Sequence, residues 1–67
     1  MLTNDTASSK ERRSLILQML DQENEVSVTT LSKALNTSEV TIRKDLTLLQ
    51  ERRLLVRTRG GAIRRPV

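Results

Sequence analysis

The segment Ser38–Leu49 constrains the fold most, because its residues suit a helix with two chemically different sides. Ser38 is a good N-cap, since its hydroxyl can accept a hydrogen bond from the backbone N–H of Thr41. Glu39 places negative charge at the positive end of the helix dipole. At about 100° per residue, one side carries a narrow apolar stripe formed by Ile42, Leu46 and Leu49. We therefore predict a helix over about residues 38–51 that buries this stripe and leaves its opposite side available to a partner.

The opposite side of this helix suits the major groove of DNA. We expect contacts from its short and cationic side chains, which are Ser38, Val40, Thr41, Arg43, Lys44 and Thr47. Val40 and Thr41 carry methyl groups that can touch thymine. Arg43 and Lys44 can reach guanine edges or phosphates. The same two cations would also be ordinary on a solvated surface, so the neighbouring segments have to decide between the two interpretations.

Length and residue types argue against an enzyme. A chain of 67 residues forms one small domain, which buries only roughly 60% of its unfolded surface and has no room for a deep catalytic cavity. The absence of His and Cys removes the commonest general base and the commonest zinc ligands. We expect no catalysis, no metal and no cofactor in this domain. No apolar run approaches the roughly 20 residues that span a bilayer, so we expect a cytoplasmic protein without membrane contact.

Charge is distributed unevenly along the chain. Residues 1–42 carry a net charge of −2, whereas residues 43–67 carry +6. Seven of the eight cations in the second half are Arg, whose planar fork suits phosphate and guanine. The chain has no Phe, Tyr or Trp, the side chains on which single-stranded bases usually stack. Duplex DNA is therefore the expected partner.

A first helix is predicted at about residues 9–22, after a flexible arm formed by residues 1–8. Ser8 or Ser9 can cap it, and its apolar stripe consists of Leu15, Ile16, Met19 and Leu20. Arg12 falls within that stripe, where a cation needs a partner. We expect an ion pair between Arg12 and Asp45, which lies at the edge of the apolar stripe of the third helix. The alternative is that Arg12 extends along the surface to solvent.

The segment between these helices predicts a helix-turn-helix. Val26–Val28 alternates as a short strand, which needs a partner strand elsewhere. Ser27 can cap a second helix at about residues 28–35, whose inward residues would be Leu31, Ala34 and Leu35. Asn36 tolerates the left-handed conformation that a tight corner between two helices requires. Two capped helices joined by a short turn form a helix-turn-helix.

A β-hairpin is predicted at about residues 54–65. Its strands would be Leu54–Thr58 and Ala62–Arg65, joined by a turn at residues 59–61 whose glycines can serve positive φ angles. The alternation leaves open whether Leu55 or Val56 faces inward. With Val26–Val28 as a third strand, the hairpin can lay an apolar face on the helices.

The hairpin is also a candidate for DNA contact, because a hairpin beside a major-groove helix can reach the adjacent backbone or minor groove. The expected contacts are Arg57, Arg59, Gly60, Gly61 and Arg64. Strand alternation would send either Arg57 and Arg59, or Arg59 and Arg64, toward the DNA.

Three segments closely resemble the N-terminal winged helix-turn-helix domain of the DeoR family of bacterial transcriptional regulators. These segments are Val26–Leu31, Ser38–Leu46 and Leu54–Ala62, and the resemblance covers about residues 10–64. The runs S-E-V-T-I-R-K-D-L and R-T-x-G-G-A at this separation are specific to that family. The resemblance implies a mainly α fold, a winged helix-turn-helix of three helices and a short three-stranded antiparallel sheet, over residues 9–65. Two positions depart from the family pattern: Arg53 stands where Gly, Asn or Asp is usual, and Arg59 where His is frequent.

The resemblance further implies sequence-specific binding to double-stranded operator DNA, as the DNA-binding domain of a regulator that represses carbohydrate-utilisation genes. Residues 66–67 would begin a linker to a C-terminal domain that binds a sugar phosphate effector and is absent from this sequence. The isolated domain is expected to be monomeric and the full-length protein homo-oligomeric. The alternative function is a winged-helix interaction module that binds an acidic protein partner. The operator sequence, the effector and the choice between repression and activation are not written in these residues.

Overall fold

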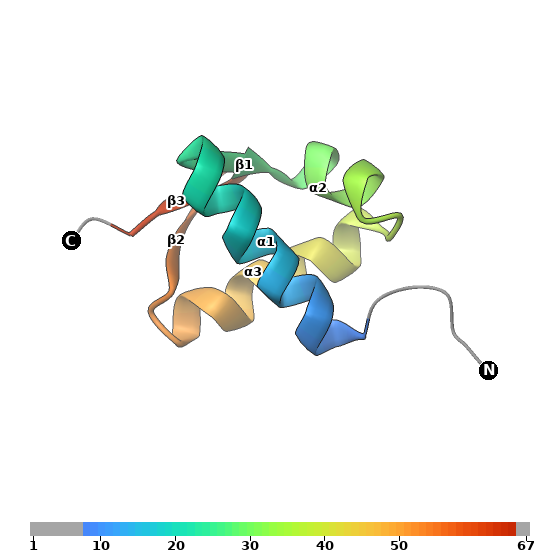
Figure 1. Ribbon diagram of the computed structural model, residues 1–67, viewed down its shortest axis with the longest axis horizontal. Coiled ribbons are helices and arrows are strands. Elements are labelled where there is room, and N and C mark those ends of the chain that lie inside the picture. The colour runs from blue at the N-terminus through green and yellow to red at the C-terminus, as the bar shows by residue number, and fades with distance from the viewer. Residues whose placement is uncertain (1–7, 66–67) are drawn as a thin grey trace.

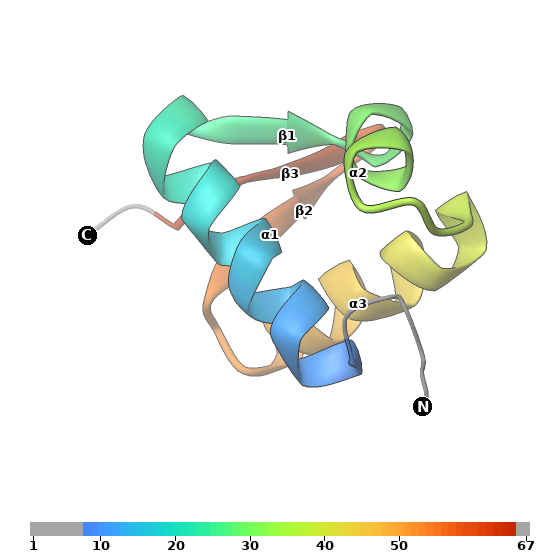
Figure 2. The same ribbon diagram turned by 45° about the vertical axis from the view of Figure 1, so that its right-hand side comes forward.

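The computed structural model describes residues 8–65, which fold into three helices and one three-stranded sheet (Figure 1). The helices are α1 (Ser9–Glu23), α2 (Val28–Ala34) and α3 (Glu39–Glu51), and the strands are β1 (Glu25–Ser27), β2 (Leu55–Thr58) and β3 (Gly61–Arg64). The sheet is antiparallel in the order β1-β3-β2, so β1 completes the edge of the β2–β3 hairpin (Figure 2). The predicted winged helix-turn-helix is confirmed. Most of the predicted arm and the predicted linker start, residues 1–7 and 66–67, lie outside the described residues.

Each helix begins after a serine whose hydroxyl accepts a backbone N–H of the first turn. Ser27 accepts from Thr30 N at 3.0 Å, and Ser38 accepts from Thr41 N at 3.1 Å, as predicted for both caps. Ser8, one of two candidates for α1, forms a capping box with Glu11. Such caps satisfy N–H groups that the helix itself leaves without acceptors, so the three helix starts are determined locally.

Each helix is followed by a residue in the left-handed conformation. These residues are Asn24 (φ 70°), Asn36 (φ 53°) and Arg53 (φ 62°). The prediction for Asn36 is confirmed. Asn enters this region at little cost because its short side chain hydrogen-bonds locally, whereas a long side chain pays the steric penalty. The end of α3 is therefore locally strained at Arg53.

One apolar core joins the three helices to the inner face of the sheet. It consists of Ile16, Leu20, Val28, Leu31, Ile42, Leu46, Leu49, Leu55 and Ala62. Leu55 is the inward member of the pair left open by the sequence, and Val56 is 37% exposed. Two expected core positions are wrong: Leu15 and Ala34 are exposed. Ile16 and Leu20, one turn apart, face the core from α1, and this rotation turns Leu15 outward.

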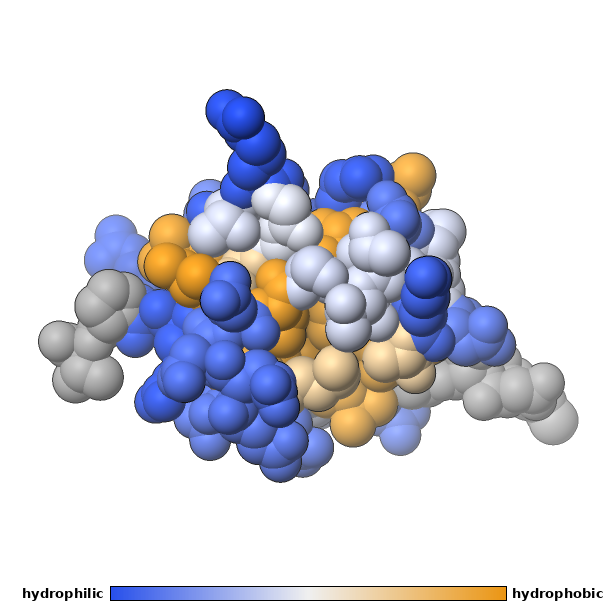
Figure 3. Space-filling view, turned by 90° about the horizontal axis from the view of Figure 1, so that it is seen from above, coloured by the Kyte–Doolittle hydropathy of each residue, from blue (hydrophilic) through white to orange (hydrophobic). Residues whose placement is uncertain are grey.

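The core of so small a domain is not completely covered. Figure 3, which looks onto the molecule from above the view of Figure 1, shows hydrophobic side chains reaching the surface between charged and neutral polar ones. Partly buried Leu17, Met19, Val26 and Leu35 pack against the core from its margin. This partial cover agrees with the surface-to-volume limit of a short chain.

The first strand and the hairpin glycines differ from the predictions. Val28 is the first residue of α2 and is buried, whereas the strand consists of Glu25–Ser27. Neither Gly60 nor Gly61 has a positive φ, so that prediction is wrong. A Cβ at Gly61 would lie 1.8 Å from the backbone oxygen of Val26, so Gly61 is needed for the close approach of β1 to β3.

Candidate nucleic-acid interface

An ion pair joins α1 to the buried side of α3. Arg12 Nη2 donates to Asp45 Oδ1 at 3.2 Å, and its Nε donates to Oδ2. Arg13 Nη1 lies 3.8 Å from the same carboxylate, which is only 5% exposed as a residue. The hydrogen bond to Asp45 raises the pKa of the Arg12 guanidinium, so this cation stays charged. The predicted pair is confirmed, and it holds the apolar stripe of α3 under α1.

The outward side of α3 carries most of the side chains expected to contact DNA. Val40 is 59% exposed, and Arg43 and Lys44 are exposed one turn further along the helix. Ser38 is exposed as the N-cap, and its hydroxyl lies 3.0 Å from the hydroxyl of half-buried Thr41. Lys44 has no salt bridge with any residue between 8 and 65. The exposed side of α3 therefore offers an apolar group and two cations to a partner.

Glu39 connects this side of α3 to the start of α2, a contact that the sequence analysis missed. Its Oε1 lies 3.1 Å from Arg43 Nη2 and its Oε2 lies 3.3 Å from Thr29 Oγ1. The four-residue spacing of Glu39 and Arg43 is visible in the sequence and is typical of a helical ion pair. The contact with Thr29 joins two helices, and no local pattern in the sequence indicates it.

The turn between β2 and β3 lies at the same end of the molecule as the starts of α2 and α3. The backbone N–H of Val28, the first residue of α2, donates to Gly60 O at 2.8 Å. The first turn of α2 therefore lies beside the hairpin turn and, through Thr29, beside the first turn of α3. Arg59 is exposed in that turn. The starts of both helices and the turn form one contiguous surface.

Two of the expected contact residues bind each other. Arg57 Nη1 on β2 donates to Thr47 Oγ1 on α3 at 2.9 Å, and Thr47 Oγ1 also lies 2.9 Å from the carbonyl oxygen of Arg43. Both residues are half-buried. The structure therefore places Thr47 and Arg57 at the margin of the exposed surface, with the Thr47 hydroxyl and Arg57 Nη1 hydrogen-bonded inside the protein.

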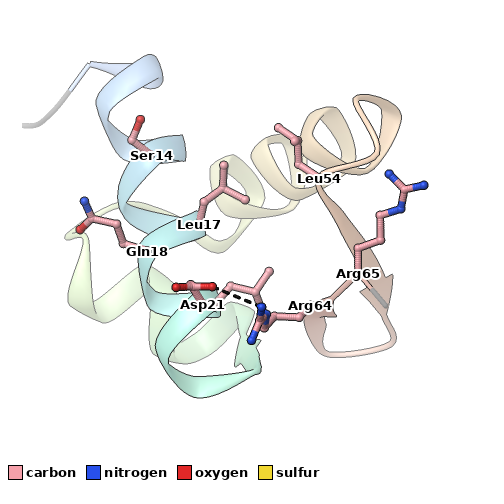
Figure 4. Close-up of a pocket in the computed structure, with 8 residues that line it drawn as sticks. Ser14, Leu17, Gln18, Asp21, Leu54, Arg64 and Arg65 are labelled. Atoms are coloured by element: carbon pink, nitrogen blue, oxygen red, sulfur yellow. Dashed lines mark ion pairs between the residues drawn. The ribbon is translucent and has the colours of Figure 1, made fainter. Parts of the chain in front are cut away.

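Arg64 and Gly61 lie away from this surface. Arg64 Nη2 lies 3.5 Å from Asp21 Oδ1 (Figure 4). Its Nη1 lies 3.3 Å from Asn24 Oδ1. Arg64 thus points toward the C-terminal end of α1, into an open groove between α1 and the hairpin. Gly61 is buried where β3 meets β1. The sequence left open whether Arg57 or Arg64 accompanies Arg59. Arg64 pairs with Leu55, at the end of the hairpin far from the turn that carries Arg59.

Metal binding and membrane insertion were the two remaining possibilities for the described residues. Between residues 8 and 65, no group of three or more His, Cys, Asp or Glu side chains is placed to hold a metal ion. No helix in that range is long and apolar enough to cross a bilayer.

The sequence of the chain matches a known family and several of its members. The model of the DeoR-like helix-turn-helix domain matches residues 12–65. The chain is 42% identical over 53 residues to the HTH-type transcriptional regulator GolR of Listeria innocua, covering 79% of this chain and 21% of that protein. It is 44% identical over 55 residues to a putative aga operon transcriptional repressor of Escherichia coli O157:H7, covering 82% of this chain and 20% of that protein.

A third relative is shorter. The chain is 39% identical over 57 residues to a putative galactitol utilization operon repressor of Escherichia coli K12, covering 85% of this chain and 51% of that protein. The chain thus spans about a fifth of the length of the first two relatives and about half of the third. No solved structure matches the chain significantly.

Proposed function

The chain belongs to the DeoR-like helix-turn-helix family of DNA-binding transcription regulators, and we propose that it recognises a specific duplex operator through α3 and the β2–β3 turn. In this proposal α3 enters the major groove. Its contact residues are Ser38, Val40, Thr41, Arg43 and Lys44, and the turn adds Arg59 and Gly60. We call these seven residues the recognition surface.

One observation carries the proposal: the start of α3 and the hairpin turn both lie against the first turn of α2. The link from Gly60 O to Val28 N and the link from Thr29 to Glu39 bring them to the same end of the molecule. A helix in the major groove with an Arg-bearing turn beside it can read base edges and neutralise neighbouring phosphates at once. Neutralised phosphates release counterions, which drives binding, while the bases give specificity.

The wider role follows from the names of the relatives. Two of them carry the names putative aga operon transcriptional repressor and putative galactitol utilization operon repressor. We propose that this domain serves a bacterial regulator in the cytoplasm that represses a carbohydrate-utilisation operon. The sugar phosphate effector and homo-oligomeric state of such a regulator would belong to a separate C-terminal domain, and the isolated 67-residue domain would bind as a monomer.

The test is selection of bound duplexes from a random DNA library. Sequences recovered after several rounds should share a short motif, and the chain should prefer that motif over random duplex by a large factor. If the recovered sequences share no motif, and an acidic polypeptide such as polyglutamate displaces them all equally, the chain is an acidic-partner module instead. The competition with polyglutamate is needed because a basic surface binds any polyanion at low salt.

A further inference from the structure

The side chain of Arg57 lies between β2 and α3. Its backbone N–H donates to Gln50 Oε1 at 2.7 Å, and its Nη1 donates to Thr47 Oγ1 at 2.9 Å. Its Nε is buried and has no hydrogen-bond acceptor among residues 8–65. The buried Nε and the contact of Nη1 with Thr47 show that one edge of this half-buried guanidinium is directed against α3.

Thr47 uses both capacities of its hydroxyl inside the protein. It donates to the carbonyl oxygen of Arg43 at 2.9 Å and accepts the N–H of Arg57. A hydroxyl can donate only one hydrogen bond, and here the carbonyl oxygen of Arg43 accepts it. The link therefore runs from β2 through Thr47 to the turn of α3 that presents Arg43.

Hydrogen bonds tie the hairpin to the helices on both sides of Arg59. The contacts of Arg57 with Thr47 and Gln50 hold β2 against α3, and the contact of Gly60 O with Val28 N holds the turn against α2. Arg59 lies between these two anchors and is exposed. Its position relative to the exposed side of α3 therefore depends on both.

We propose that Arg57 and Thr47 form a positioning pair that sets where Arg59 lies relative to α3, and that Arg57 itself does not neutralise a phosphate. This inference rests on the proposed function, since it assumes that α3 and Arg59 bind the same duplex. It assigns the basic residues of the hairpin different tasks, one holding the turn and the other touching DNA.

The test is a double-mutant cycle between Arg57→Met and Arg59→Ala. Met keeps the length and apolar stem of Arg57 and removes its charge and donors. Affinity for a duplex recovered in the library selection is measured over a range of salt concentrations. Arg57→Met should weaken binding in the wild-type background and cause little further loss in the Arg59→Ala background, because a misplaced turn matters only when Arg59 is present. A phosphate contact made by Arg57 would instead lower the salt slope by about a further 0.9 in the Arg59→Ala background, which overturns the proposal.

Thr47→Val provides a second variant that leaves all charges in place. Val has nearly the shape of Thr but cannot accept the Arg57 N–H. The protein should remain folded, lose affinity about as much as Arg57→Met, and keep its preference at every base pair. Loss of preference at a single base pair would show that Thr47 reads that base and would overturn the positioning role.

Arg65→Met is the matched control for loss of one hairpin charge, because Arg65 donates to Arg53 O and has no contact with α3 side chains among the described hydrogen bonds. Its effect should be the same with or without Arg59. Failure of the wild-type chain to bind any selected duplex would refute the proposed function. Binding with additive losses from Arg57→Met and Arg59→Ala would refute only this inference.

Discussion

Arg65 and Arg53 are joined by a hydrogen bond in which Arg65 Nη1 donates to the carbonyl oxygen of Arg53 at 2.9 Å. The contact ties the end of the hairpin to the second residue after α3, where the chain turns with φ 62°. Around it, Arg53 N donates to Gln50 O and Leu54 N donates to Leu49 O. These are the two bonds of a Schellman motif, which usually has Gly or Asn at the left-handed position. Only the backbone of Arg53 is used in these contacts.

Arg53→Asn should therefore stabilise the domain. The left-handed conformation costs a long side chain roughly 1–2 kcal/mol, and Asn tolerates it better. We expect a gain of up to about 1 kcal/mol in the free energy of unfolding, measured by urea denaturation. Arg52→Asn is the control, since Arg52 has φ −86° and the same loss of charge. An equal gain from both variants would mean that charge, and not the backbone, is responsible.

Removing Arg12 should destabilise the domain strongly. Arg12→Ala leaves the carboxylate of Asp45 buried with only the longer contact to Arg13, and breaking a buried pair costs about 3 kcal/mol or more. Arg64→Ala breaks an exposed pair with Asp21 and should cost under about 1 kcal/mol. The double variant Arg12→Met with Asp45→Leu should be closer to wild type than Arg12→Ala. Thermal unfolding followed by circular dichroism measures all three.

The orientation of α3 can be tested through its core residues. Leu46 is fully buried, so Leu46→Ala should cost roughly 2–5 kcal/mol and leave so small a domain largely unfolded. Leu54 is 47% exposed, and Leu54→Ala should change stability far less. Circular dichroism and amide hydrogen exchange report both. A folded Leu46→Ala protein with unchanged stability would show that the recognition surface is also misassigned.

Base reading by α3 should appear as lost preference at defined positions. Arg43→Ala and Lys44→Ala should each relax preference at particular base pairs by about 1–3 kcal/mol, measured on a panel of single-base variants of the selected duplex. Equal losses on selected and random duplexes would make these residues phosphate contacts. For Val40 the probe is thymine replaced by uracil, which removes only a methyl group. The apolar contact fails if no replacement in the site weakens binding.

Arg59 should act through the DNA backbone. Arg59→Ala should weaken selected and random duplexes similarly and flatten the slope of log affinity against log salt by about 0.9, because one fewer phosphate is neutralised. Base preference should stay nearly intact. A collapse of affinity for one sequence at constant slope would indicate that Arg59 reads a base or the shape of the groove. If neither the affinity nor the salt slope changes, the hairpin has a purely structural role.

Local interactions made much of this fold predictable. The caps at Ser27 and Ser38 and the left-handed Asn36 involve residues within one turn of each other, so their residue types indicate them directly. The pairing of Arg12 with Asp45 was also predictable, because a cation within an apolar stripe requires a partner. Leu15 and Ala34 were misplaced because a stripe read from the sequence leaves the rotation of a helix uncertain.

The sequence alone thus determined the elements, the side of α3 that is exposed and the family to which the chain belongs. The contacts of the hairpin residues depend instead on how distant segments pack together. Arg57 and Arg64 look alike in the sequence, yet one contacts Thr47 on α3 and the other Asp21 on α1. Gly61 looked like a turn residue, but it is required where β1 pairs closely with β3. The physical reason is that the contacts of a long side chain, and the space beside a glycine, depend on which distant element packs there. No local pattern in the sequence identifies that neighbour.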